Sequence, residues 1–460
     1  MVTECDGIDR SITIEFPTTG IEVAPHETDL RLDRRKYAHG KFTLTRGAGE
    51  FIANNVPDFS KAYIRISDTR AHRMVFFSDG LTFEKDMQGD NVVELELADA
   101  SKVLKNGTIT ENFEEVTLEE LIEYIMDQFG DPDNVITGYD PVGSTDIQEK
   151  RDSLEDESNS NIVSEKLDEF GSALARGLLD KSDEFLGTDY METIHDGFDW
   201  QKVTPLQALS EVMQEFELDW WVTKDGVLKI GIDGTTGQVF ASTGTEDNVV
   251  IQHYGVTNAP DRVRGVHLEG SYQATRGPKR LNLFGDLEYN KLVGIAETVD
   301  FSSNGVVVGN NDIQKGFSSL EELEEITKRQ LYREMINQTS GSIGVNGLAS
   351  SDKDTLAVLD VGDILILDTS LNEKCGDRQI ITGPYLIFGI QHKRNPREGW
   401  TIDLELTRIP DFSQVKTVSV WYDPEEDKEY ESLEEYNNET TAGFNFDPSF
   451  DVDLDLDEVL

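Results

Sequence analysis

The chain has 460 residues, enough for two or three domains with sizeable cores, and its 41 Lys and Arg stand against 90 Asp and Glu, a formal net charge of −49. This balance argues against a nucleic-acid binder and against a binder of anionic membranes, because both hold phosphate groups with clustered Lys and Arg. Cys5 and Cys375 are the only cysteines, which excludes a disulfide framework and a CxxC metal knuckle and leaves open one bond between them.

The acidity also predicts the solvent in which the protein works. Self-repulsion of this size destabilises a compact state in dilute salt, whereas at 1 M salt the screening length falls to roughly 3 Å. We therefore expect a protein of very concentrated salt, as in extremely halophilic archaea and their viruses. The alternative is an acidic surface that binds metal ions or basic partners. The opening residues lack a secretory signal and no apolar run reaches the length of a membrane span, so a soluble protein is expected.

Residues 1–112 read as an all-β domain, a barrel or a sandwich. Residues 94–99 alternate between polar and apolar, as a half-buried antiparallel strand does. Turn-forming Gly, Asn, Asp and Pro separate the strands. The predicted strands are Ser11–Phe16, Lys41–Thr45, Ala62–Ser67, Met74–Phe77 and Val92–Leu97.

A basic island interrupts this acidic domain between its first strands. It consists of Arg31, Arg34, Arg35 and Lys36. One interpretation is a solvated loop. The other is a contact with an acidic neighbouring subunit, in which a fixed positive patch would set the register. The four residues are therefore the candidate subunit contact.

Residues 113–235 predict an α+β connector. Thr117 and Glu120 form a capping box that opens a helix ending near Gly130. An acidic, Ser- and Gly-rich stretch at about 131–161 suits a mobile excursion, and a short helix is expected at about Val163–Leu179.

The best-specified part of the chain is Thr204–Gly231. Thr204 and Gln207 make a second capping box, with Pro205 at the first helical position. A helical apolar stripe then gives way to aromatic and β-branched residues from Trp220, which Asp225-Gly226 break as in a tight hairpin. We expect a helix packed on a hairpin, a scaffold pattern with no polar residue left over for chemistry.

Residues 236–412 return to strands around one long helix at 319–338. Ser319 caps that helix, Glu322 completes the box, and acids precede bases along it, as the helix dipole favours. The predicted strands are Val239–Ala241, Val249–His253, Arg262–Leu268, Val293–Val299, Gly341–Leu348, Leu359–Leu367, Pro384–Gln391 and Gly399–Leu406.

Residues 413–460 are expected to form an acidic tail, disordered unless a partner orders it. Asp451, Asp453 and Asp455 start a calcium-loop spacing, but the sixth position is Leu456 where such a loop needs glycine. Three phenylalanines in the tail are either anchors for a partner or a weakly adherent patch. They are Phe444, Phe446 and Phe450.

No common catalytic or cofactor-binding motif occurs in the sequence with the required residues and spacing. There is no phosphate-binding P-loop, no dinucleotide loop and no HExxH, and Ser340-Gly341-Ser342 lies in a predicted strand without the leading Gly of a nucleophile elbow. With 90 acids, a carboxylate pair of the glycosidase type cannot be picked out. Seven histidines are scattered singly, and each is expected to be an ordinary strand or loop residue. They are His26, His39, His72, His195, His253, His267 and His392.

Three stretches together resemble a known family, the baseplate or tail hub proteins of tailed viruses, which include the late control protein D of contractile phages. They are the helix and hairpin at 204–230, the strand 261–268, and the helix 319–338 followed by Val361–Ile366, Gly383–Ile387 and Gly399–Leu406. They cover about half of the chain. The acidic stretch at 131–161 and the acidic tail depart from the family.

The resemblance implies a fold and an assembly. It implies two tube-like β-barrels, at 1–112 and at 236–412 with its helix, joined by the α+β connector. Three copies would form a ring that joins a six-fold tail tube to a three-fold tip in the virion. The implied partners are a distal tail or tail tube protein above, tip or fibre proteins below and a tape measure protein in the lumen. No sequence similarity between the two halves supports their equivalence.

Three functions are compatible with these patterns. The first is a structural, non-enzymatic tail hub of a halophilic tailed virus, without a cofactor or a metal. The second is a secreted or virion-borne hydrolase that acts on cell-surface glycans or peptides. The third is a receptor-binding module that uses the tail or the 131–161 stretch.

Overall fold

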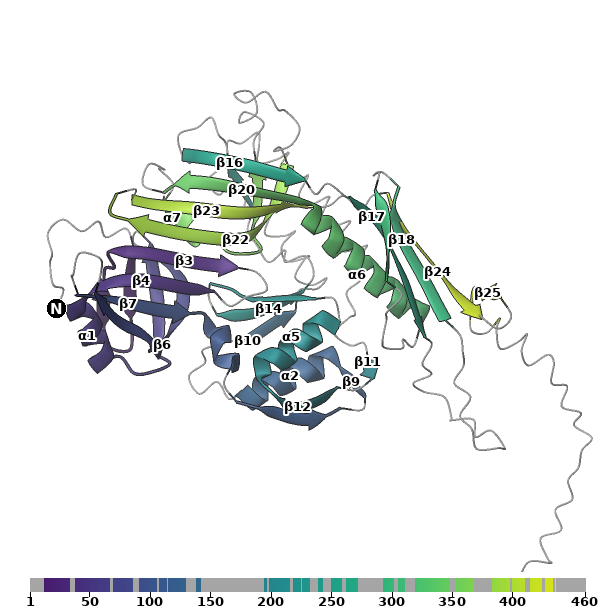
Figure 1. Ribbon diagram of the computed structural model, residues 1–460, viewed down its shortest axis with the longest axis horizontal. Coiled ribbons are helices and arrows are strands. Elements are labelled where there is room, and N and C mark those ends of the chain that lie inside the picture. The colour runs from purple at the N-terminus through teal and green to yellow at the C-terminus, as the bar shows by residue number, and fades with distance from the viewer. Residues whose placement is uncertain are drawn as a thin grey trace, which may run out of the picture. The chain divides into compact units, whose positions relative to one another are not determined.

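The structure, a computed structural model, is mainly β, with a helix-and-hairpin connector between two β domains, and it confirms the predicted fold class (Figure 1). The residues that it describes are 12–33, 38–66, 69–85, 91–105, 107–113, 115–129, 138–141, 194–196, 198–215, 218–224, 226–231, 239–242, 250–258, 262–271, 293–301, 305–310, 319–347, 353–367, 383–397, 399–409, 414–423, 427–432 and 435. Both cysteines, the predicted helix at 163–179 and the three aspartates and three phenylalanines of the tail lie outside these ranges.

Two compact units divide the chain. Unit 1 comprises residues 1–264, 302–306 and 329–414, and unit 2 comprises 265–301, 307–328 and 415–460. Unit 1 holds the first β domain, the connector and most of the second β domain. Unit 2 is therefore assembled from segments that lie within and after the second β domain in the sequence.

The first β domain is an antiparallel sheet in the strand order β3-β4-β7-β6-β5-β1-β2. Alternate residues of its strands, such as Leu30, Phe42 and Leu95, are fully buried, because the pleat points every second side chain into the core. Its elements are β1 (Ile12–Phe16), β2 (Ile21–Val23), β3 (Glu27–Asp33), β4 (His39–Thr45), α1 (Arg46–Asn55), β5 (Lys61–Ile66), β6 (Thr69–Lys85), β7 (Asn91–Ala98) and the 3-10 helix Ala100–Lys105.

The connector contains the two capped helices that the sequence predicts. Thr204 N–H donates to Gln207 Oε1 at 2.9 Å and Gln207 N–H donates to Thr204 Oγ1 at 3.2 Å, and Thr117 and Glu120 exchange the same pair of bonds. The helices α2 and α5 pack on each other, and the hairpin β13–β14 forms as predicted. The elements are β8 (Ile109–Asn112), β9 (Glu115–Thr117), α2 (Leu118–Phe129), β10 (Gly138–Pro141), β11 (Ile194–Asp196), β12 (Asp199–Val203), α5 (Pro205–Glu215), β13 (Asp219–Val222) and β14 (Val227–Gly231).

The second β domain has the strand order β16-β20-β23-β22, with β21 on the far edge of β22 and β15 beside β21. Its elements are β15 (Val239–Ser242), β16 (Val250–Asn258), β20 (Thr339–Asn346), α7 (Lys353–Val358), β21 (Ile364–Leu367), β22 (Gly383–Asn395) and β23 (Gly399–Arg408). The structure starts β21 at Ile364 rather than Leu359, because Val361-Gly362 form a turn in which Gly362 has φ +96°.

The two β domains repeat one topology, although their sequences show no similarity. In the first domain β3 pairs with β4, β4 with β7, β7 with β6 and β6 with β5. In the second, β16 pairs with β20, β20 with β23, β23 with β22 and β22 with β21. All eight pairings are antiparallel, a helix follows the second strand in each domain, and the long strands β6 and β22 each have a register shift against their neighbour. Only the outermost pairing differs, since β1–β5 is antiparallel and β15–β21 is parallel.

One strand pairing joins the two domains into a single sheet. Residues 389–394 of β22 pair antiparallel with residues 28–33 of β3, and Figure 1 shows the two strands side by side. The buried side chains of both domains, for example Leu30 and Ile390, belong to one hydrophobic cluster. The described strands thus run without interruption from β16 at one end of the sheet to β2 at the other.

Unit 2 contains a five-stranded sheet in the order β19-β17-β18-β24-β25, in which β17–β18, β18–β24 and β24–β25 are antiparallel. Its strands are β17 (Val263–Ser271), β18 (Val293–Asp300), β19 (Val306–Asn310), β24 (Val415–Asp423) and β25 (Lys428–Tyr430). The helix α6 (Leu320–Gln338) contributes residues 320–328 to unit 2 and 329–338 to unit 1. Its Ser319 cap forms as predicted, with Glu322 N–H donating to Ser319 Oγ at 3.2 Å.

The structure contains several elements that the sequence did not predict, and three of these differences bear on the architecture. β3 and α1 were not expected, β10 lies inside the acidic stretch 131–161, and β24 and β25 lie inside the expected tail. The last difference has a packing cause, because Trp421 and Tyr430 are buried in the sheet of unit 2 despite the acids around them. Composition alone placed the start of the tail at residue 413, whereas strand structure continues to residue 430.

Candidate subunit-contact surface

Arg31, the one described residue of the basic island, lies on β3 at the junction of the two domains. Its neighbour across the junction is Gln391, and its guanidinium donates to Glu405 Oε1 of β23 at 3.3 Å. The side chains of Arg31 and Glu405 are 43 % and 57 % exposed, so solvent screens the ion pair and its contribution to stability is small, about 0–1 kcal/mol. The pair fixes the alignment of the junction more than its stability.

Gly389 lies directly beside this ion pair. It lies opposite Asp33 on one side and Glu405 on the other, next to the register shift of β22. A Cβ atom at residue 389 would come within 3.2 Å of Glu405 Oε2. A side chain at residue 389 would therefore crowd the Glu405 side chain, whose carboxylate accepts from Arg31.

The structure thus shows a partner for Arg31 within the chain itself. Arg34, Arg35 and Lys36 lie outside the described residues, so the role of the basic island as a contact with another subunit stays a prediction.

The solvent-facing side of the joined sheet is polar across both domains. Ion pairs and hydrogen bonds link neighbouring strands on this side: Lys41 with Glu94 at 3.2 Å, Gln391 with Asp29 at 2.6 Å and Lys393 with Asp403 at 2.8 Å. The opposite side carries the shared hydrophobic cluster. Such one-sided patterning is typical of an antiparallel wall that separates a core from water.

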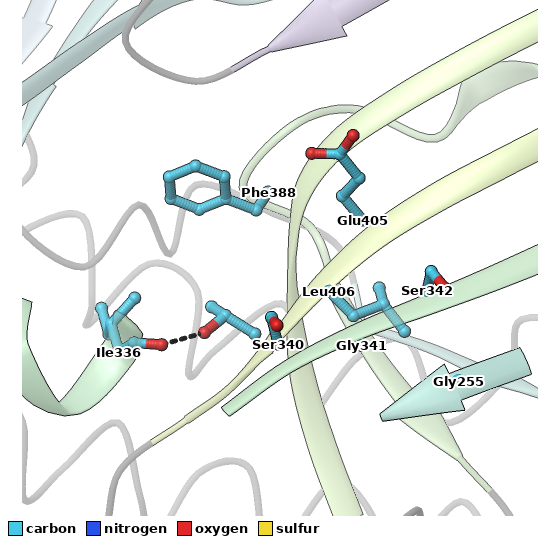
Figure 2. A pocket seen from close by; sticks show the side chains of 9 residues that line it. Gly255, Ile336, Ser340, Gly341, Ser342, Phe388, Glu405 and Leu406 are labelled. Carbon is cyan, nitrogen blue, oxygen red and sulfur yellow. Dashed lines mark hydrogen bonds between the residues drawn. The ribbon is translucent and has the colours of Figure 1, made fainter. Parts of the chain in front are cut away.

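A pocket of about 400 Å³ is lined in part by Glu405, the partner of Arg31 (Figure 2). Among its described lining residues Glu405 alone is titratable, and Thr407 Oγ1 donates to the carbonyl of Ile336, another lining residue. The lining residues come from β16, β20, β22, β23 and the end of α6, and they are Gly255, Ile336, Ser340, Gly341, Ser342, Phe388, Glu405, Leu406 and Thr407.

Two histidines that the sequence shows far apart meet on the buried side of the junction. The rings of His72 (β6) and His392 (β22) lie 5.3 Å apart between centroids, and both side chains are buried. Trp400 stacks on His392 and its Nε1–H donates to His392 Nδ1 at 3.3 Å. Within the described part of the chain, both nitrogens of His72 and Nε2 of His392 have no hydrogen-bond partner. Both histidines lie in strands, as is usual for a lone histidine, but their unpaired ring nitrogens depart from the satisfied residue that the sequence led us to expect.

Burial decides the charge state of the two histidines. It lowers the pKa of His392 to about 3, and together with the nearby His392 and Lys224 it holds the pKa of His72 well below the usual range. Both rings are therefore neutral at ordinary pH. Because Trp400 donates to Nδ1 of His392, the proton of that neutral ring resides on Nε2.

Lys224, at the tip of the β13–β14 hairpin, ties the connector to both β domains. Its N–H donates to Asp360 Oδ2 at 2.8 Å and its ammonium group donates to the carbonyl of Val358 at 2.9 Å, both in the second domain. Its carbonyl accepts from the N–H of Arg73 in the first domain at 2.8 Å. The hairpin that the sequence predicts therefore braces the junction from the side of the connector.

His267 of unit 2 lies between two carboxylates, with Nε2 3.1 Å from Glu269 and Nδ1 3.4 Å from Glu297. Across the residues that the structure describes, no three His, Cys, Asp or Glu side chains are grouped so that they could hold a metal ion. No helix among them has the length and apolarity to cross a membrane.

The fold is shared with known tail proteins. A tail protein from Neisseria meningitidis MC58 superposes with a TM-score of 0.54 at 12 % identity, over 86 % of this chain and 96 % of that one. A 43 kDa tail protein of prophage MuSo2 from Shewanella oneidensis gives 0.49 at 8 % identity, over 86 % and 98 %. The E. coli protein c3393, a type VI secretion component described as similar to the T4 tail proteins gp27 and gp5, gives 0.47 at 7 % identity, over 87 % and 77 %. No family model and no curated protein sequence matches the chain.

Sequence reasoning missed most of the residues that build the junction. Gly389 carries no local signal beyond being a glycine in a strand, which does favour a bulge or a close approach. Glu405 is one acid among 90. The Asp-Gly turn did locate the hairpin tip, but nothing near Lys224 in the sequence indicates its contacts.

Proposed function

We propose that the protein is a structural hub of a viral tail, in which three copies form a ring between a six-fold tail tube and a three-fold tip. The observation that carries the proposal is the internal repeat: two domains of one topology, joined edge to edge in one sheet. Three chains with two such domains each would present six similar surfaces to a six-fold partner and three to a three-fold partner.

The polar side of the sheet supports a channel-forming role. Three chains with their sheets in series would enclose a space whose wall carries the linked charges of strands such as β3 and β23, while each core stays behind that wall. The likeness to the Neisseria tail protein supports the fold that this assembly needs. In this proposal the protein acts through its shape and the strands carry no catalytic role.

The partners follow from the same assembly. A distal tail or tail tube protein would sit on the six-fold side, tip or fibre proteins on the three-fold side, and a tape measure protein in the lumen, all within the virion. The formal charge of −49 supports a virion that assembles in concentrated salt.

The mass of the purified protein in solution tests the proposal. In about 3 M salt, light scattering coupled to size exclusion is expected to give three times the chain mass of 51.6 kDa. A protein that stays monomeric at micromolar concentration and above in that salt would refute the ring. Measurable turnover of glycans or peptides that is lost on replacing one carboxylate would refute the structural assignment.

A further inference from the structure

The repeat makes the junction between β22 and β3 comparable with a second place in the chain. On one edge of β22, the first half pairs with β21 and the second half, residues 389–394, pairs with β3. On the corresponding edge of β6, the first half pairs with β5, and residues 81–85 have no strand partner among the described residues. As far as the described strands extend, the position that β3 fills beside β22 is therefore open beside β6.

The strand that corresponds to β3 is also open. β3 lies between β4 and β22, whereas β16 pairs with β20 alone and ends the sheet in the described part of the chain. An open edge strand is normally protected by charged residues or proline. β16 spans nine residues, VIQHYGVTN, and none of them is Asp, Glu, Lys, Arg or Pro, although 28 % of the chain is charged.

The exposure of the side chains at the open edge of β6 indicates that a neighbouring strand is absent there among those that the structure describes. In the second half of β22, the inward residues Ile390 and His392 are at most 1 % exposed beneath the joined sheet. In the second half of β6, Phe83 lies opposite the buried Val93 and is nevertheless 51 % exposed. A large aromatic side chain on the core side of an unpaired strand is a surface that another strand would cover.

We infer that β16 of one copy pairs antiparallel with residues 81–85 of β6 in the next copy, so that the contact between chains repeats the contact between the domains within a chain. The inference rests on the proposed ring and names the strands that close it. Backbone hydrogen bonds would extend the sheet from chain to chain, and Phe83 would be covered by the neighbour. A contact of this head-to-tail kind closes into a ring when the rotation per copy divides a full turn.

Disulfide trapping tests the strand pair. In a background with Cys5→Ser and Cys375→Ser, cysteine replaces Thr82 or Glu84, exposed residues of β6, and is combined in turn with cysteine at His253, Gly255 or Thr257, alternate residues of β16. A Cβ atom at Gly255 meets only Ser342 Oγ, at an ordinary 3.6 Å. Oxidation in about 3 M salt is expected to give covalent dimers and trimers for at least one combination. The control replaces the cysteine on β6 by Thr43→Cys, on a strand that is paired on both sides, and is expected to give no multimers.

A second variant tests the same contact without a disulfide. Phe83→Asp is expected to lower the assembled fraction at least tenfold in high salt and to leave far-UV circular dichroism unchanged, because Phe83 is half exposed within the single chain. Val418→Asp, at a residue 65 % exposed in unit 2, is the matched control and is expected to assemble normally.

The outcomes separate this inference from the proposed function. A monomeric mass for the unaltered protein would refute both. A trimer that forms no multimer in any cysteine combination, and that tolerates Phe83→Asp, would refute the β6–β16 pairing and leave the hub intact.

Discussion

His72 and His392 make the junction sensitive to acid. An unfolded histidine titrates near pH 6.5, whereas burial lowers the pKa of His392 to about 3. Below pH 6.5 the unfolded chain therefore binds protons that the folded junction does not bind. Above pH 6.5 these rings therefore give the free energy of unfolding no dependence on pH. As the pH falls from 6.5 toward 3, it decreases by about 1.4 kcal/mol per pH unit for each proton that the unfolded chain alone binds.

Replacing one histidine measures this effect. The free energy of unfolding is followed by denaturant titrations at constant high salt. Between pH 6.5 and 5, His392→Phe is expected to lose less of it than the unaltered protein, and the difference should correspond to the binding of about one proton. Burial raises the pKa of Asp99 to about 6, so this group makes the folded protein more stable as the pH falls over the same range. For this reason the test compares the slope of unfolding free energy against pH between the variant and the unaltered protein. Ile402→Val, at the residue that pairs with His392, should cost about 1 kcal/mol with an unchanged slope. Equal slopes for His392→Phe and the unaltered protein would contradict the assignment.

Lys224 shows how one residue, through its backbone and its side chain, can brace three segments. Lys224→Met removes the ammonium donor of the Val358 carbonyl and keeps both backbone hydrogen bonds of residue 224. We expect a loss of about 1–3 kcal/mol in unfolding free energy, because a half-buried carbonyl loses a charged donor. The control Lys61→Met, on a half-exposed strand residue, should change stability by less than about 0.5 kcal/mol. A similar result for both variants would show that the bond to Val358 contributes nothing.

At the scale of elements, the packing of α1 on the sheet depends on a glycine, although nothing in the helix sequence itself indicates this role. Thr45 caps this helix, with Ala48 N–H donating to Thr45 Oγ1 at 3.3 Å. Gly49 faces Val93 of β7, where a Cβ atom would come within 2.5 Å of the Val93 side chain, while a Cβ atom at Gly47 would meet nothing within 4 Å. The helix thus approaches the sheet closely at one glycine only.

These two glycines form a matched pair of alanine substitutions. Gly49→Ala is expected to destabilise the first β domain by about 1–3 kcal/mol through overpacking. Gly47→Ala is expected to stabilise it by about 0.5–1 kcal/mol, because alanine loses less backbone entropy in a helix. Thermal melts of both variants at one salt concentration check the signs, and equal signs would show that α1 does not pack as described.

Sequence signals were sufficient where a local rule sets the element. The boxes at Thr117, Thr204 and Ser319 located α2, α5 and α6, and period-two alternation located β7. β3 was missed because Asp29, Arg31 and Asp33 read as a solvated loop, although they are the outward half of a strand whose Leu30 and Leu32 are buried. The helix α1 was missed because its two glycines, Gly47 and Gly49, are unfavourable residues in a helix.

The junction itself lay beyond sequence reasoning, because it depends on contacts between distant segments. The register of β22 against β3 follows from the bulge near Gly389, and neither leaves a periodic pattern. The two domains repeat their topology through pairing order, and the same order can be built from unrelated side chains. Of the four basic residues proposed for a subunit contact, Arg31 alone is described, and its observed partner belongs to its own chain.

At the scale of the whole molecule, net charge sets the conditions under which the fold persists. The charge of −49 repels itself strongly at low ionic strength, and near 1 M salt charges more than roughly 3 Å apart are screened from one another. We expect the melting temperature to rise by more than about 10 °C between about 0.1 M and 3 M potassium chloride. Potassium chloride is used because it screens charge with little of the surface exclusion that sulfate causes. A melting temperature that is flat or falls over this range would contradict the adaptation to concentrated salt.

The pairing of β3 with β22 imposes a delay during synthesis. β3 leaves the ribosome early, and the strand that covers it, residues 389–394, is made about 350 residues later. At roughly 5–20 residues per second, the nascent first domain waits about 20–70 s with one edge uncovered. Along that edge Glu27, Asp29, Arg31 and Asp33 alternate with buried residues, and such charges discourage wrong pairing between neighbouring nascent chains. These charged residues of β3 face water in the finished junction, and before β22 is made they keep the unpaired edge of β3 from pairing with the wrong strand.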